Sequence, residues 1–139
     1  MEEKKVRMGI IGLGGRGYSM MLGEWMLAPE VEITAVCDVY EDRTRAAVDA
    51  VLERTGKAPF GTQKYTEVLK RDLVDAVYIA TDWATHVEIA VAAMRAGVAV
   101  AMEVGGASDI QECFDLVNTW KETKTPFMMM ENCCFDKRE

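Results

Sequence analysis

Hydrophobic residues follow two spacings along the chain, and these spacings alternate. Continuous apolar runs are typical of buried strands and lie at residues 6–11, 31–37, 75–81, 98–102 and 127–130, with a weaker one at 58–62. Between these runs apolar residues recur every three or four positions, which predicts helices over residues 18–25, 43–55, 65–71, 85–96 and 110–117. Strands that alternate with helices predict an α/β fold: a doubly wound parallel sheet of order 3-2-1-4-5-6 in three αβα layers, forming one domain over residues 1–139.

Local signals mark where two helices begin and which faces they bury. Thr85-His86-Val87-Glu88 and Ser108-Asp109-Ile110-Gln111 both fit a capping box, so helices are predicted to begin there. The last helix is predicted to bury its apolar face, made of Ile110, Cys113, Phe114 and Val117. Met128, Met129 and Met130 are predicted to fill the core from the final strand.

Composition and charge narrow the classes of function. Half of the 139 residues are hydrophobic and the net charge is −7, which indicates a globular domain that repels nucleic acid and anionic membranes. The sequence has no apolar run long enough for a signal peptide or a membrane span, so a cytoplasmic location is expected. The four cysteines are expected to be buried free thiols rather than disulfide or zinc ligands, and no metal site is predicted.

A glycine-rich turn follows the first predicted strand and opens the first predicted helix. It reads Gly12-Leu13-Gly14-Gly15-Arg16-Gly17. Gly12 permits a tight turn, Gly14 lets the backbone approach a pyrophosphate, and Gly17 allows close packing of helix on strand. Free N–H groups at the helix start would receive the phosphates. The pattern predicts a dinucleotide site; the alternative is a glycine-rich turn without a ligand.

Asp38 ends the second predicted strand, where a carboxylate can accept hydrogen bonds from the adenosine ribose. A carboxylate repels a 2′-phosphate, so Asp38 favours NAD over NADP. Arg43 could instead receive a 2′-phosphate, which leaves NADP as the alternative. Asp38 could also cap the turn that follows it, and one residue can do both.

Two further strand ends are expected to face the nicotinamide half of the cofactor. Thr81, Asp82 and Trp83 follow the fourth strand, and Glu103 follows the fifth. Glu103 is expected to contact a ribose. Trp83 could equally be a packing residue, and His86 could be a solvated residue of the first helical turn rather than a catalytic one.

The motifs together resemble the Gfo/Idh/MocA oxidoreductase family. They are Gly-Ile-Ile-Gly-Leu-Gly-Gly-Arg-Gly, Ala-Val-Cys-Asp, Thr-x-x-x-x-His, Ala-x-x-Ala-Met-x-Ala-Gly and the ending Glu-Asn-Cys-Cys-Phe. The resemblance implies an N-terminal NAD-binding domain, hydride transfer to or from a sugar or polyol, and a C-terminal substrate domain that usually makes oligomer contacts. That second domain is absent from these 139 residues, so the chain alone is expected to turn over little or nothing. A homo-oligomer is possible.

One position separates the chain from the typical family pattern. The family motif Glu-Lys-Pro, whose lysine serves in catalysis, is Glu103-Val104-Gly105 in this chain. The Gly-Gly-Arg-Gly turn, the tryptophan before His86 and the missing lysine resemble the branch of NAD-dependent glycosidases of glycoside hydrolase family 109. Three hypotheses follow: an oxidoreductase acting on a carbohydrate, a glycosidase that uses transient redox, and an NAD-binding module without chemistry of its own.

Overall fold

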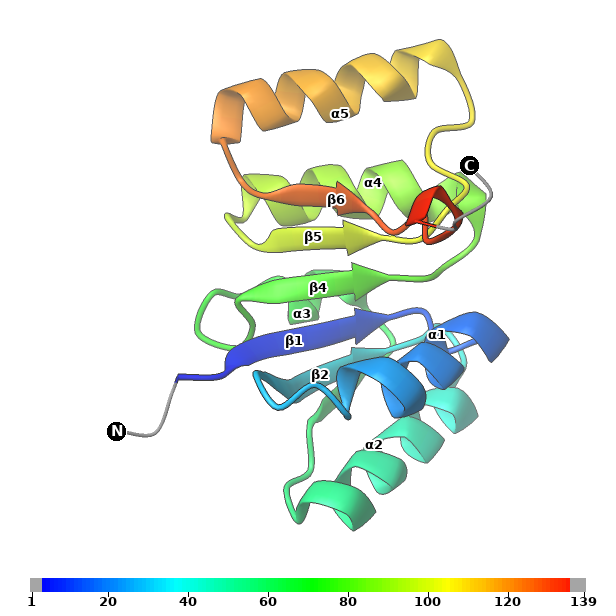
Figure 1. Ribbon diagram of the computed structural model, residues 1–139, viewed down its shortest axis with the longest axis vertical. Coiled ribbons are helices and arrows are strands. Elements are labelled where there is room, and N and C mark those ends of the chain that lie inside the picture. The colour runs from blue at the N-terminus through cyan, green and yellow to red at the C-terminus, as the bar shows by residue number, and fades with distance from the viewer. Residues whose placement is uncertain (1–3, 136–139) are drawn as a thin grey trace.

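The computed structural model describes residues 4–135 and contains one six-stranded parallel sheet (Figure 1). The strand order is β3-β2-β1-β4-β5-β6, which confirms the predicted doubly wound topology. The strands are β1 (Val6–Ile11), β2 (Val31–Cys37), β3 (Phe60–Thr62), β4 (Ala76–Ile79), β5 (Ala99–Met102) and β6 (Phe127–Met129). The helices are α1 (Gly15–Met20), η1 (Met21–Trp25), α2 (Glu41–Thr55), α3 (Tyr65–Val68), α4 (Trp83–Arg95), α5 (Ile110–Thr123) and η2 (Cys133–Phe135).

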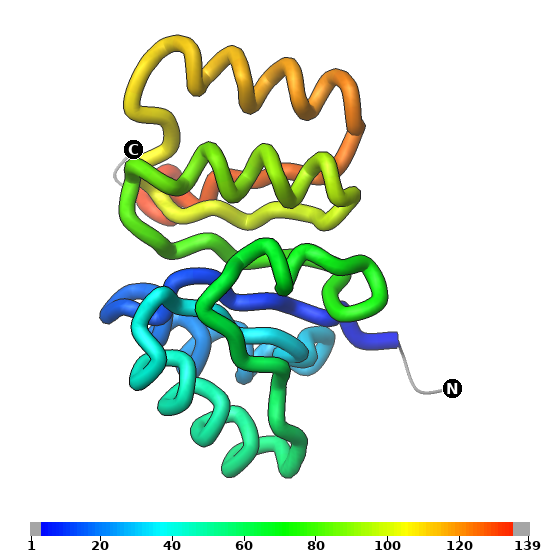
Figure 2. The backbone as a smooth tube through the Cα atoms, turned by 180° about the vertical axis from the view of Figure 1, so that it is seen from behind, coloured from blue at the N-terminus to red at the C-terminus, as the bar shows by residue number. Residues whose placement is uncertain are grey.

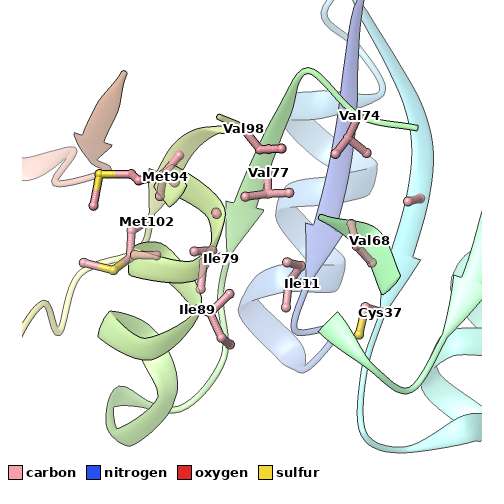
Figure 3. Packing of buried hydrophobic residues seen from close by; sticks show 14 residues of the cluster. Ile11, Cys37, Val68, Val74, Val77, Ile79, Ile89, Met94, Val98 and Met102 are labelled. Carbon is pink, nitrogen blue, oxygen red and sulfur yellow. The ribbon is translucent and has the colours of Figure 1, made fainter. Parts of the chain in front are cut away.

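Helices cover both faces of the sheet, and a hydrophobic cluster lies under each layer. On one face α1, η1 and α2 pack over the first strands, around buried residues such as Ile10, Met21 and Val51. On the other face α3 and α4 cover β1, β4 and β5, as the view from behind shows (Figure 2). Figure 3 shows the second cluster, in which Ile79 of β4 and Ile89 of α4 lie close together. The central strands are therefore buried on both faces, as their near-continuous apolar sequences predict.

The chain leaves β1 for β2 on one side and later returns to β4 on the other side of β1. β1 pairs in parallel with both β2 and β4, so the connections diverge at its carboxyl end. In a doubly wound sheet, this divergence opens a crevice beyond the strand ends. The fold therefore places the glycine turn after β1 at the point where a ligand can bind.

The first helical segment has the expected apolar face but not a uniform geometry. Residues 15–25 are helical throughout, with α1 followed by the π-helical η1. Met21 is fully buried, and the Trp25 ring packs 5.4 Å from the Tyr78 ring. The predicted helix is confirmed, and its wider last turn brings Trp25 against the sheet.

The predicted burial of the apolar face of α5 is wrong. Ile110 is 75% exposed and Phe114 56% exposed, while Cys113 and Val117 are also exposed. The helix instead packs against α4 with its opposite side, where Leu116 is partly buried and Thr119 fully so (Figure 1). Periodicity identifies which side of a helix is apolar, but not whether the same 139 residues provide a partner for it.

The final strand also departs from the prediction. Met128 is 63% exposed and Met129 44% exposed, so of the three methionines predicted to fill the core only Met130, which follows the strand, packs against it. β6 is the edge strand of the sheet, so the described residues cover neither of its faces fully. Cys133 and Cys134 are exposed as well, and of the four free cysteines only Cys37 is buried.

The residues that cap the two helices differ from those that the capping boxes predict. Asp82 caps α4 by accepting a 3.0 Å hydrogen bond from the backbone N–H of Thr85, so the helix begins three residues earlier than expected. Asp109 caps α5 through the N–H of Glu112, one residue later than expected. In each case an aspartate takes the role of the predicted serine or threonine: Asp82 lies three residues before Thr85, and Asp109 directly follows Ser108. No helix in the described part of the chain is both long and apolar enough to cross a membrane.

Candidate functional site

A cleft of about 550 Å³ opens at the carboxyl ends of β1, β2 and β4. It contains seven of the twelve predicted site residues: Gly12, Gly14, Gly15, Arg16, Asp38, Thr81 and Asp82. A larger groove of about 620 Å³ lies between α4 and α5. That groove is lined by Glu88, Glu112, Asp115 and Glu122, and this concentration of negative charge is unfavourable for a phosphate ligand.

Two positions in the glycine turn have no room for any residue larger than glycine. Gly12 has a φ of +93°, and a Cβ there would lie 2.5 Å from the carbonyl carbon of Ala80. A Cβ on Gly17 would lie 1.9 Å from the carbonyl oxygen of Gly12. The positive φ of Gly12 agrees with the tight turn predicted there, and the contact at Gly17 agrees with the predicted close packing of helix on strand.

Gly14 and Gly15, in contrast, face open space. A Cβ on Gly14 would meet only Arg43 Nη1, at 3.7 Å, and a Cβ on Gly15 would have no atom within 4 Å. Packing of the protein therefore does not require glycine at either position. Gly14 is also the N-cap of α1 and makes no side-chain capping bond, so this helix start has backbone donors for an anion.

The Asp38 carboxylate lies at the end of β2 and is 7% exposed. Its Oδ2 accepts a 2.7 Å hydrogen bond from the backbone N–H of Leu13, and its Oδ1 accepts one of 3.0 Å from Tyr40 N–H. Each oxygen keeps a lone pair, so the carboxylate can hold the glycine turn and still accept a ligand hydroxyl. Leu13 itself is buried in the core and contributes only its backbone to the site.

Arg43 is the cation closest to this end of the cleft. Its Nη1 lies 3.8 Å from Asp38 Oδ2, and its guanidinium lies 4.6 Å above the Tyr40 ring. Asp38 therefore engages the group that could otherwise bind a 2′-phosphate. Cys37 lies beside Asp38, and burial raises the pKa of its thiol to about 12, so the thiol is neutral and not a nucleophile at neutral pH.

Thr81 and Asp82 form the opposite wall of the cleft, and His86 lies buried behind them. The Asp82 side chain caps α4, and the Thr81 hydroxyl accepts a bond from the Thr85 hydroxyl at 2.9 Å. His86 is 1% exposed, and its Nε2 lies 3.1 Å from the Thr81 carbonyl oxygen. Burial lowers the pKa of His86, so its ring is neutral at pH 7. The imidazole is thus neither the solvated residue considered from sequence nor part of the cleft lining.

Glu103 follows β5 and lies beside the far end of the turn, held by three donors. Its Oε1 accepts hydrogen bonds from the Tyr78 hydroxyl at 2.7 Å and from Arg16 Nε at 3.0 Å, and its Oε2 accepts one from Val104 N–H at 3.2 Å. Burial raises the pKa of Glu103, but these hydrogen bonds and the Arg16 charge outweigh it and lower the pKa overall. The carboxylate is therefore ionised although it is 9% exposed.

Trp83 begins α4 and is 65% exposed. Its indole lies over Gly105, where a Cβ would be 2.2 Å from two ring atoms, and Gly105 has a φ of +120°. Glycine in place of the proline of Glu-Lys-Pro thus makes room for the Trp83 ring over Gly105. Trp83 both packs on this turn and presents ring surface to solvent.

Sequence reasoning missed Tyr78 as a site residue. The available signal was a single tyrosine in the apolar run that leads to Thr81, where an aliphatic residue would be usual. The aliphatic pattern assigns the position to the core, which is correct for the ring, since Tyr78 has 0% exposure. The pattern does not show that the hydroxyl reaches Glu103 on the neighbouring strand.

Comparisons with known proteins agree with this geometry. A family profile described as the Gfo/Idh/MocA oxidoreductase family, NAD-binding Rossmann fold, matches residues 6–131. The chain is 39% identical to a glycosyl hydrolase family 109 protein of Akkermansia muciniphila, with 97% of this chain and 29% of that protein aligned. It is 38% identical to an alpha-N-acetylgalactosaminidase of Bacteroides fragilis, with 94% of this chain and 31% of that protein aligned.

Two solved structures show the same fold. Myo-inositol 2-dehydrogenase of Lactobacillus plantarum superposes with a TM-score of 0.84 at 22% identity, over 96% of this chain and 38% of that chain. Scyllo-inositol dehydrogenase of Lactobacillus casei, solved with NAD(H) and scyllo-inositol, gives 0.82 at 20% identity, over 96% of this chain and 38% of that chain. The chain spans about three tenths of the length of the curated relatives it matches. It belongs to the Gfo/Idh/MocA oxidoreductase family and is an NAD-binding Rossmann domain of that family.

Proposed function

We propose that NAD lies across the cleft with its diphosphate against the backbone N–H groups that follow Gly14. The observation that carries this proposal is the open space over Gly14 and Gly15, because no packing contact otherwise calls for glycine there. Asp38 would accept hydrogen bonds from the adenosine ribose, and Glu103 from the ribose on the nicotinamide side. Trp83 and Thr81 would border the nicotinamide, with His86 supporting the Thr81 carbonyl from inside.

The same arrangement favours NAD over NADP. A 2′-phosphate on the adenosine ribose would approach the buried Asp38 carboxylate, and Arg43 is already paired with that carboxylate. Calorimetric titration of the 139-residue chain with NAD and NADP tests the assignment. We expect NAD to bind at least about tenfold more tightly, and equal affinities would remove the proposed role of Asp38.

For the whole protein, we propose hydride transfer between this cofactor and a sugar or related polyol. When bound, NAD supplies a hydride acceptor. The support is family membership and the relatives named for carbohydrate substrates. Those relatives are about three times as long as this chain, and we propose that their additional length supplies a substrate domain. The 139 residues alone should bind NAD without oxidising a sugar at an appreciable rate.

A second candidate is an NAD-dependent glycosidase. It is favoured by Val104 at the position of the family lysine, and by relatives named as glycosyl hydrolases. Without a lysine ammonium, this position has no proton donor or acceptor for simple alcohol oxidation. Assays of a full-length protein carrying this domain decide between the two. Net NADH formation from a free sugar supports the dehydrogenase, and aryl-glycoside cleavage without net NADH supports the glycosidase.

A non-catalytic NAD-binding module is the remaining alternative, and inactivity of the full-length protein in both assays would favour it.

We propose a cytoplasmic location, since NAD and unpaired cysteines are typical of that compartment. We also propose that nucleic acids and membranes are not partners, because the chain has a net charge of −7. A homo-oligomer remains a proposal, which light scattering of the full-length protein tests.

A further inference from the structure

Tyr78 places a hydroxyl in the interior of the domain. Its side chain has 0% exposure, and its ring packs against Trp25 on the α1 side of the sheet. The hydroxyl donates to Glu103 Oε1 at 2.7 Å, across the β4–β5 strand pair. Burial and the Glu103 charge both raise the pKa of Tyr78, so the hydroxyl keeps its proton and remains a donor.

The three donors around Glu103 come from three separate parts of the fold. Tyr78 lies in β4, Arg16 in α1, and the Val104 N–H follows β5 directly. Tyr78 is fully buried, whereas the Arg16 side chain is 52% exposed. The tyrosine is therefore the rigid support, because a buried ring has few alternative rotamers and an exposed arginine has many.

We propose that Tyr78 is a positioning residue, whose hydroxyl fixes the Glu103 carboxylate in the orientation that receives the ribose on the nicotinamide side. This inference rests on the proposed NAD site. Oε1 is occupied by Tyr78 and Arg16, which leaves a lone pair of Oε2 for the ligand. Neither Tyr78 nor Glu103 is among the residues that line the cleft, but Arg16 is, and its hydrogen bond joins Glu103 to that lining. Tyr78 acts only through Glu103.

The proposal distinguishes one half of the cofactor from the other. ADP contains the adenosine ribose and the diphosphate but lacks the second ribose and the nicotinamide. Tyr78→Phe keeps the buried ring and removes only the hydroxyl. We expect the variant to bind NAD about tenfold more weakly and ADP within twofold of the wild type, because only NAD reaches Glu103. Calorimetry with both ligands measures the ratio of the two affinities.

A matched control removes a similar hydrogen bond elsewhere. The Tyr65 hydroxyl donates to Glu88 at 2.6 Å, and this bond involves neither Glu103 nor any of its three donors. Tyr65→Phe should leave the NAD-to-ADP affinity ratio unchanged. If Tyr78→Phe only destabilised the fold, the affinities for NAD and ADP would fall together. An equal fall in the two affinities would therefore contradict the positioning role.

A double-mutant cycle tests whether Tyr78 acts through Glu103. Glu103→Ala removes the carboxylate that Tyr78 holds and should weaken NAD binding, and adding Tyr78→Phe to it should weaken NAD binding by less than twofold more. Full additivity of the two losses would overturn the proposal. If wild type binds neither NAD nor ADP, the proposed cofactor site fails. If wild type binds both and Tyr78→Phe keeps the wild-type ratio, only the role of Tyr78 fails.

Discussion

The backbone N–H of Leu13 donates a 2.7 Å hydrogen bond to the buried Asp38 carboxylate, which joins the glycine turn to the end of β2. The residue proposed to recognise the adenosine ribose therefore also holds the loop proposed to receive the diphosphate. Because one carboxylate serves both ends of the ADP moiety, cofactor selection and the stability of the turn should change together in Asp38 variants.

Asp38→Asn should lower both NAD affinity and stability. The amide keeps one acceptor but loses the charge, so the bonds to Leu13 N–H and Tyr40 N–H cannot both be kept at full strength. We expect about 1–2 kcal/mol less stability and about tenfold weaker NAD binding, with the preference over NADP reduced. Chemical denaturation and calorimetry measure the two effects.

Asp42→Asn is the control for this change, because Asp42 is an exposed acidic residue in the first turn of α2. It removes the same charge a short distance along the chain and should alter NAD affinity by less than twofold. If Asp38→Asn behaves like Asp42→Asn, Asp38 has no role in the selection of NAD.

Gly14→Ala should separate binding from folding. The backbone of Gly14 has a φ of −68° and a ψ of −172°, which alanine adopts without strain, and its Cβ would point into open space. We expect an unfolding midpoint near that of the wild type and NAD binding at least tenfold weaker, because the methyl group would occupy the place of the diphosphate.

Gly23→Ala provides the comparison, since Gly23 lies in η1 and a Cβ there also meets no atom within 4 Å. It should leave NAD binding unchanged and stabilise the chain by up to about 1 kcal/mol. Similar NAD affinities for Gly14→Ala and Gly23→Ala would place the diphosphate away from this turn.

Gly17→Ala should damage the fold rather than binding alone. Its Cβ would lie 1.9 Å from the Gly12 carbonyl oxygen, so α1 would have to move away from β1. We expect a loss of at least about 3 kcal/mol of stability, measured by thermal or chemical unfolding. A variant as stable as the wild type would show that this close contact is not maintained in solution.

The buried His86 should make stability depend on pH. Burial lowers its pKa below the ordinary 6.5, so the unfolded chain takes up the proton first as the pH falls. The stability that neutral His86 contributes is present above pH 6.5 and decreases as the pH falls through 6.5 towards the lower folded-state pKa. His86→Gln can still donate to the Thr81 carbonyl but does not titrate.

Unfolding free energies of the wild type and His86→Gln, measured between pH 7.5 and pH 5, test this dependence. The wild type should lose more stability over this range than the variant. Parallel curves for the two proteins would mean that the imidazole is not buried in its neutral form.

The sequence predicts the sheet well because its strands are buried on both faces and read as continuous apolar runs. It predicts helix α5 but not the environment of its apolar side, because Ile110 and Phe114 show which side is apolar and not what covers it. The predicted cap residues were wrong because several side chains that can cap lie within a few residues of each helix start, as Asp82 and Thr85 do.

The sequence predicts those parts of the site that depend on backbone conformation. The glycines report local conformation, and the structure places Gly12 and Gly17 in tight contacts and Gly14 in the open. The interactions of Glu103 with Arg16 and Tyr78 depend on residues distant in sequence and on neighbouring elements. Side-chain hydrogen bonds of this kind have no periodic signature, so a single sequence does not reveal them.

Backbone amide NMR of the isotope-labelled chain during titration with NAD tests whether the diphosphate binds at the glycine turn. We predict that the amide signals of Gly14, Gly15 and Arg16 shift most, that ADP reproduces these shifts, and that Gly14→Ala needs at least tenfold more NAD for shifts of the same size. Shifts confined to the acidic groove between α4 and α5, with the turn unchanged by saturating NAD, would rule out this binding site.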